Sequence, residues 1–131
     1  MTNKLYDILL DDEKIGSTEL ENADAPMGVV FGQINFTSIN SGYDFFKNYC
    51  LKNNIKFTDH PEDRLIIRMN IPNLKVFDIN GNEIKGHGGC LVNGIDSDIF
   101  EITILGIPYP FYQKEFPHHV KTYNELYKDQ Q

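Results

Sequence analysis

The chain has 131 residues, of which 40% are hydrophobic and 12% aromatic, and its formal net charge is -7. This length fits one domain, spanning residues 1–131, and the apolar content excludes an intrinsically disordered chain. The acidic balance, with no local basic patch, argues against binding to nucleic acid or to an anionic membrane surface.

No secretion signal and no membrane-spanning segment is predicted. The opening MTNKLYDILLDDEK has no apolar run between a basic flank and a cleavage site. No segment approaches the about 20 apolar residues that cross a bilayer. We therefore expect a cytoplasmic protein, in which Cys50 and Cys90 are two buried thiols rather than a disulfide.

The first third of the chain predicts strands. Apolar residues alternate on both sides of an acidic cluster, residues 11–13, which predicts a β-hairpin over residues 5–20 with the cluster at its tip. A loop is expected at residues 24–26, because the residue before a proline is pushed away from helical conformations. The apolar run over residues 27–36 predicts a strand, and its two glycines indicate a bulge or the close approach of another backbone.

A helix is predicted to begin after Ser41, because a serine with Asp44 three residues on is typical of a helix N-cap. The apolar residues that follow recur at helical spacing, and we expect the face that they form to be buried. These residues are Tyr43, Phe46, Tyr49 and Cys50. The helix is expected to end near Asn53-Asn54.

Three later segments predict further strands. Residues 64–69 form a short β-branched run, and residues 74–84 predict a hairpin centred on Asn80-Gly81, a dipeptide suited to a type I′ turn. The strongest alternation lies in residues 98–107, so we expect this strand near the centre of the sheet.

The C-terminal part predicts a helix behind Pro117, where apolar residues recur at steps of three and four. Before it, prolines alternate with aromatic residues over 108–112 and 116–117. These rings either cover one end of the sheet, which we favour, or form a rigid surface for a partner. The whole pattern predicts an α+β fold, a mostly antiparallel sheet of about six or seven strands with one inserted helix and one C-terminal helix.

The strongest candidate for chemistry combines His87 and Cys90 with His118 and His119. Imidazole and thiolate both bind zinc, and two ligands separated by two residues can chelate one ion. Adjacent histidines, however, point in different directions, and a structural zinc site usually has two compact ligand pairs. A glycine-rich turn and exposed histidines at a helix start explain these residues without a metal. We therefore predict no cofactor and keep the metal site as the alternative.

Residues 15–32 resemble a segment that a group of small bacterial proteins shares. The shared pattern is I-G-x-[ST]-x-L-E-x-x-D-x-P-M-G-V-x-x-G, and it matches Ile15-Gly16-Ser17-Thr18 followed by Leu20 to Gly32. The match spans about the first quarter of the chain and implies no catalytic residues. In size, acidity, expected location and α+β composition, the chain is also similar to the immunity proteins that bacteria make against their own secreted toxins.

These features favour a cytoplasmic protein-binding module of the immunity type, which neutralises a cognate toxin or another basic protein by occlusion. A toxin that cleaves nucleic acid has a basic cleft, and an acidic protein can block it with fast electrostatic association. The predicted partner-binding residues are carboxylates around the first hairpin: Asp11, Asp12, Glu13, Glu21 and Asp24. The alternatives are a metal-binding protein or metal-dependent enzyme that uses the His/Cys cluster, and a homo-oligomeric structural protein. A homodimer is compatible with the immunity interpretation.

Overall fold

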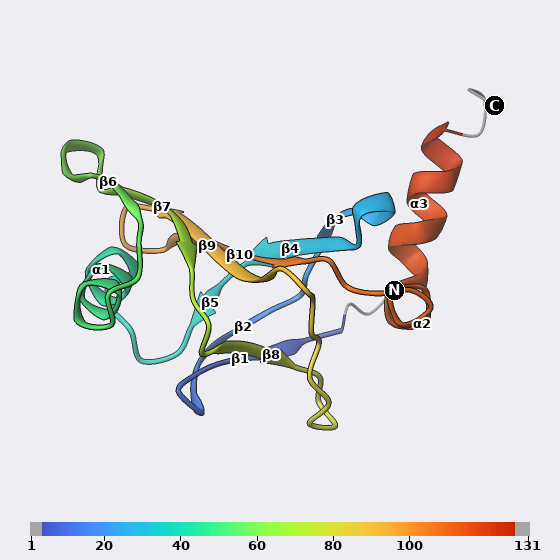
Figure 1. Ribbon diagram of the computed structural model, residues 1–131, viewed down its shortest axis with the longest axis horizontal. Coiled ribbons are helices and arrows are strands. Elements are labelled where there is room, and N and C mark those ends of the chain that lie inside the picture. Colours follow the sequence, from blue (N-terminus) through green and yellow to red (C-terminus); the bar gives the residue numbers. More distant parts are fainter. Residues whose placement is uncertain (1–3, 128–131) are drawn as a thin grey trace.

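The computed structural model describes residues 4–127 and contains two antiparallel sheets and three α-helices (Figure 1). The smaller sheet has the strand order β5-β2-β1-β8, with β1 (Tyr6–Leu10), β2 (Glu13–Thr18), β5 (Asn35–Phe36) and β8 (Leu74–Phe77). The larger sheet has the order β3-β4-β10-β9-β7-β6, with β3 (Asn22–Asp24), β4 (Val29–Gln33), β6 (Thr58–His60), β7 (Leu65–Asn70), β9 (Gly89–Ile95) and β10 (Ile99–Leu105). The helices are α1 (Gly42–Lys52), α2 (Phe111–Glu115) and α3 (Pro117–Tyr127), with short 3-10 helices η1 (Ala25–Met27) and η2 (Pro61–Asp63).

The predicted α+β class is confirmed, together with its internal helix and its C-terminal helix. The strands form two sheets of four and six rather than one sheet, because the chain crosses between sheets inside a segment expected to be one strand. Within residues 27–36, β4 belongs to the larger sheet and β5 to the smaller one. Ile34 lies between them, is buried, and donates its backbone N–H to the Phe100 carbonyl at 2.8 Å. This contact fixes the point at which the chain leaves one sheet for the other.

The core lies between the two sheets. From the larger sheet, β10 contributes Phe100, Ile102 and Ile104, which are all buried. From the smaller sheet, Ile8 and Val76 are fully buried. β10 lies between β4 and β9, so the prediction that this strand is central is confirmed.

Helix α1 begins and ends where the sequence predicts. The Ser41 hydroxyl oxygen accepts a hydrogen bond from the Asp44 backbone N–H at 3.2 Å, and the helix stops at the C-cap residue Asn53. The inward face is confirmed as Tyr43, Phe46 and Cys50, which are buried, while Tyr49 is half-buried. Both cysteines are buried and free, as expected.

Replacing Ser41 with alanine is expected to lower the free energy of unfolding by about 1 kcal/mol, because the Asp44 N–H loses its capping acceptor. Ser41→Asn keeps an acceptor at this position and serves as the matched control, with an expected change of a few tenths of a kcal/mol, about the cost of exchanging good caps. Urea denaturation followed by circular dichroism measures both. Equal losses in the two variants would show that the cap contributes nothing.

Residues 74–84 reverse direction as the predicted hairpin should, with backbone hydrogen bonds from Ile84 N–H to the Val76 carbonyl at 2.8 Å and from Asp78 N–H to the Asn82 carbonyl at 2.9 Å, but the second arm and the turn type differ from the prediction. β8 is followed by a single bridge rather than by a second strand. A type I′ turn needs positive φ at both central residues, but Gly81 has a φ of +84° whereas Asn80 is not in the positive region. The Gly81 N–H donates to the Asp78 carbonyl at 3.1 Å, and the Asp78 carboxylate accepts further hydrogen bonds from the backbone N–H groups of Asn80 and Asn82, both at 2.9 Å. The Asp78 side chain therefore supports a turn that is not of type I′.

Gly28 and Gly32 lie where other segments come close, as predicted. A Cβ atom at Gly32 would lie 2.5 Å from the Thr18 hydroxyl oxygen and 2.9 Å from the Leu20 backbone nitrogen. Gly28 has a φ of +67°, and a Cβ atom there would lie 2.5 Å from the Ile107 carbonyl oxygen. Larger residues at either position would push neighbouring backbone away.

The aromatic segment before α3 packs onto the ends of the strands, which confirms the favoured prediction for its two most buried rings. Tyr112 and Phe116 are buried, and the Tyr112 hydroxyl donates to the Val29 carbonyl at 3.0 Å. The Phe116 ring lies 6.0 Å from that of Tyr6 between centroids. Helix α3 then extends away from the body of the fold, and none of its described side chains is buried (Figure 1).

Candidate functional site

The predicted acidic tip connects β1 to β2. Asp11 and Asp12 form a two-residue turn with φ values of 50° and 67°, a conformation that aspartate tolerates better than most residues. Asp11 is held in place, because the Tyr49 hydroxyl donates to its Oδ1 at 3.2 Å. The exposed carboxylates of Asp12 and Glu13 form no ion pair with any described residue, so they can meet a partner.

Glu21 and Asp24 lie in another part of the molecule. Asp24 belongs to β3, the edge strand of the larger sheet, and Glu21 directly precedes this strand. Glu21 Oε2 accepts a hydrogen bond from the Gln33 backbone N–H at 2.9 Å, which ties the start of β3 to β4. Figure 1 shows the hairpin tip at the bottom of the view and β3 near the top. The structure therefore places the five predicted partner-binding residues in two separate groups.

The predicted His/Cys cluster is not assembled. The rings of His118 and His119 lie at the start of α3 with centroids 4.1 Å apart and planes tilted by 44°, and His119 Nε2 lies 2.8 Å from the Leu20 carbonyl oxygen. Cys90 points into the core, and burial raises the pKa of its thiol to about 12, with a smaller contribution from the charge of Glu83. Within residues 4–127, no group of three or more His, Cys, Asp and Glu side chains is placed to hold a metal ion.

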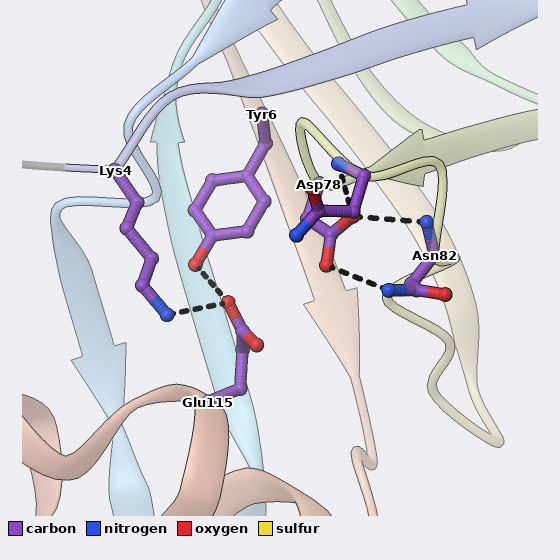
Figure 2. Close-up of polar contacts among 6 residues, drawn as sticks. Lys4, Tyr6, Asp78, Asn82 and Glu115 are labelled. Atoms are coloured by element: carbon purple, nitrogen blue, oxygen red, sulfur yellow. Dashed lines mark hydrogen bonds and ion pairs between the residues drawn. The ribbon is translucent and has the colours of Figure 1, made fainter.

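Figure 2 shows a polar cluster that the sequence did not predict. The buried Tyr6 hydroxyl donates to Glu115 Oε2 at 2.7 Å, and the Lys4 ammonium lies 3.2 Å from the same oxygen. Asp78 lies on the other side of a hollow of about 280 Å³. Its carboxylate already accepts hydrogen bonds from the backbone of its own turn. No local pattern could have revealed the cluster, because Tyr6 and Glu115 are 109 positions apart.

This cluster stabilises the fold by linking β1 to α2 through the hydrogen bond between Tyr6 and Glu115. Burial, and then the hydrogen bond to Glu115, raises the pKa of Tyr6 above its ordinary value, so the phenol keeps its proton. Backbone donation from Asn82 lowers the pKa of Asp78. The tyrosine is thus not activated as a base, and the Glu115 oxygen already accepts two donors. The hollow contains no paired nucleophile and base.

A second polar cluster fastens α1 to β6. The Tyr43 hydroxyl donates to Asp59 Oδ1 at 2.6 Å, and the Lys47 ammonium lies 2.9 Å from Asp59 Oδ2. The hydrogen bond from Tyr43 is the main reason that the pKa of Asp59 is lowered, while the same bond raises the pKa of Tyr43. The Tyr43 hydroxyl, the Lys47 ammonium and the Asp59 carboxylate are hydrogen-bonded to one another. This cluster therefore also stabilises the fold.

No described helix is both long and apolar enough to cross a membrane. Comparison of the chain with protein-family models, with curated proteins and with solved structures finds no match.

Proposed function

We propose that this chain is a cytoplasmic protein-binding module of the immunity type, which neutralises a cognate bacterial toxin by covering its basic active site. Occlusion needs a stable, shaped surface of the right charge and no catalytic group of its own. The two polar clusters described above serve the fold, which leaves surface complementarity as the property that can act on another molecule.

The observation that carries this proposal is the excess of carboxylates without a cationic partner. Acidic residues outnumber basic ones by 19 to 12. Among the described residues, carboxylates form ion pairs at five positions: Asp7, Asp44, Asp59, Asp96 and Glu115. Exposed carboxylates that form no ion pair with a described residue, such as Asp12, Glu13 and Asp98, repel one another and attract a basic surface. Such a charge distribution speeds the approach of a basic toxin and favours a tight complex with it.

Affinity capture from the source organism's lysate and culture fluid tests the proposal, with the full chain as bait. We expect one basic protein that binds at low salt and leaves at high salt, because exposed charges are screened there. Addition of the chain in equimolar amount is expected to abolish the toxic activity of that protein. A captured protein that keeps its full activity in the complex would overturn the immunity proposal, and so would the capture of no basic protein.

Neutralising the hairpin tip is expected to slow association with the captured toxin several-fold at low salt, through the loss of electrostatic steering. The variant carries Asp11→Asn, Asp12→Asn and Glu13→Gln, and asparagine keeps the positive φ values of the turn. Stopped-flow or surface plasmon resonance measures the rate constant at several salt concentrations. The difference from the unmodified chain should vanish near 1 M salt, where the Debye length is about 3 Å. An unchanged rate constant at low salt would remove the tip from the interaction.

A further inference from the structure

The larger sheet has one covered face and one open face. β10 turns Phe100, Ile102 and Ile104 to the core, whereas the residues between and beside them are partly or largely exposed. β9 alternates in the same way. In Figure 1, the smaller sheet and α1 lie on the inner side of β9 and β10, and no described helix lies across their outer side. The outer side is therefore a sheet face without a covering layer.

Apolar side chains form two groups on this open face, separated by a polar row. Cross-strand pairing places Leu65, Ile95 and Ile99 in one row over β7, β9 and β10. Leu91 on β9 and Phe31 on β4 belong to a second row. They lie on either side of Thr103, the residue of β10 with which both pair. Ile95 is 39% exposed and Ile99 59% exposed, which is unusual for isoleucine in a sheet. Exposed isoleucines of this kind, beside the partly exposed Leu65, are typical of a protein-binding surface.

A carboxylate without a cationic partner lies between the two rows. Glu101 is flanked on β9 by Asn93 and on β4 by Gln33, and it forms no ion pair with any described residue. Partial burial, and then the negative charge of Glu21, raises the pKa of Glu101. A partly desolvated carboxylate beside another negative charge is unfavourable until a cation compensates it.

We propose that the outer face of the larger sheet, with Glu101 near its centre, is the docking surface for a basic protein that places an arginine or lysine among apolar side chains. The inference rests on the proposed function, because that basic protein is the toxin to be occluded. Apolar contacts from the rows would exclude water, and the cation would form a charge-assisted hydrogen bond with Glu101.

The carboxylates on the face favour this occupant. Asp24 lies on β3 at one edge of the sheet, and the negative charge of Glu21 acts on Glu101. Asp96, in the turn between β9 and β10, is paired with Arg64 at 3.7 Å and adds little to this charge. A second copy of the chain would bring Glu101 and Asp24 close to the same carboxylates of the first copy, and such like-charge contacts are unfavourable. A basic surface meets both the apolar rows and the acidic surroundings.

The probe for the test is a synthetic amphipathic helical peptide that carries arginine within a leucine face, titrated into the isotopically labelled full chain. Nuclear magnetic resonance is expected to show saturable shifts of amides in β4, β9 and β10. Glu101→Lys should weaken binding by at least about tenfold. Glu125→Lys, on exposed α3, makes the same change in net charge and is expected to weaken binding less than about twofold, as an exposed charge away from the contact should.

The outcomes separate the docking surface from the proposed function. Shifts confined to the hairpin tip or to α3, no saturable binding, or equal weakening by the two lysine variants would overturn the docking surface. The docking surface is also wrong if a captured and neutralised toxin binds the Glu101→Lys chain as tightly as the unmodified chain, although the immunity function would then stand. If the peptide binds this face through Glu101 but no toxin is neutralised, the surface stands and the immunity function is wrong.

Discussion

Replacing Phe100 with alanine is expected to lower the free energy of unfolding by about 3–5 kcal/mol, the range for removing a buried aromatic ring. The side chain is 1% exposed, stacks on Phe46 at 5.5 Å between centroids, and meets Phe36 edge-on at 5.7 Å. Its removal leaves a cavity between α1 and the larger sheet that the neighbouring rings cannot fill without leaving their rotamers. Urea denaturation followed by circular dichroism gives the value. Ile99→Ala, one position away on the open face, is the matched control, with an expected loss under about 1 kcal/mol.

The packing of the Phe100 ring against Gly94 gives a sharper test of how tightly this ring is enclosed. The two residues lie opposite each other on β10 and β9, and a Cβ atom at Gly94 would lie 2.3 Å from the Phe100 ring. Gly94→Ala alone should therefore cost about 1–3 kcal/mol through overpacking. In the double variant the ring is absent and the new methyl group occupies part of the cavity, so the combined loss should be smaller than the sum. Additive losses would contradict the close packing of this glycine against the ring.

The elements that the sequence predicted well are those long enough to display a period. Burial alternates along the seven residues of β10, and buried residues recur at helical spacing along the eleven residues of α1. β3 and β6 have three residues each, too few to show alternation, so they could not be recognised, and the two residues of β5 were merged with β4 into one predicted strand. Their existence depends on tertiary pairing with longer strands, which is a property of the whole fold.

The candidate surface was only partly predictable for a related reason. Closeness in sequence suggested that Glu21 and Asp24 belong with the hairpin tip, but the chain passes from the smaller sheet to the larger one between Thr18 and Asn22. The open face was hidden because Ile99 and Leu105, on the outward face of β10, are as apolar as the inward residues of the strand. Apolar residues on both faces are expected for a strand covered on both sides. Only the arrangement of α1 and the smaller sheet reveals that one side is bare.

Raising the pH from 8.5 to 10 is expected to lower the free energy of unfolding by about 3 kcal/mol through the two core thiols. Burial raises the pKa of Cys50 to about 11 and that of Cys90 to about 12, whereas a thiol in the unfolded chain titrates near its ordinary value of about 8.5. Above pH 8.5 the unfolded state therefore binds fewer protons than the folded state, and stability falls as the pH rises. Each thiol contributes a slope that approaches about 1.4 kcal/mol per pH unit until the pH reaches its folded-state pKa.

Urea denaturation at pH 7, 8.5 and 10, with a reductant present, measures this dependence. The Cys50→Ala, Cys90→Ala double variant is the control, because it lacks both titrating groups while keeping the rest of the core. It should be less stable at pH 7, since two buried side chains are truncated, yet lose much less stability between pH 8.5 and 10 than the unmodified chain. Near pH 7 the thiols are protonated in both the folded and the unfolded state. Their contribution to the change of the unfolding free energy with pH should therefore approach zero there. An equal alkaline slope in the two proteins would mean that the thiols are not held protonated by the core, and that other groups govern its stability at high pH.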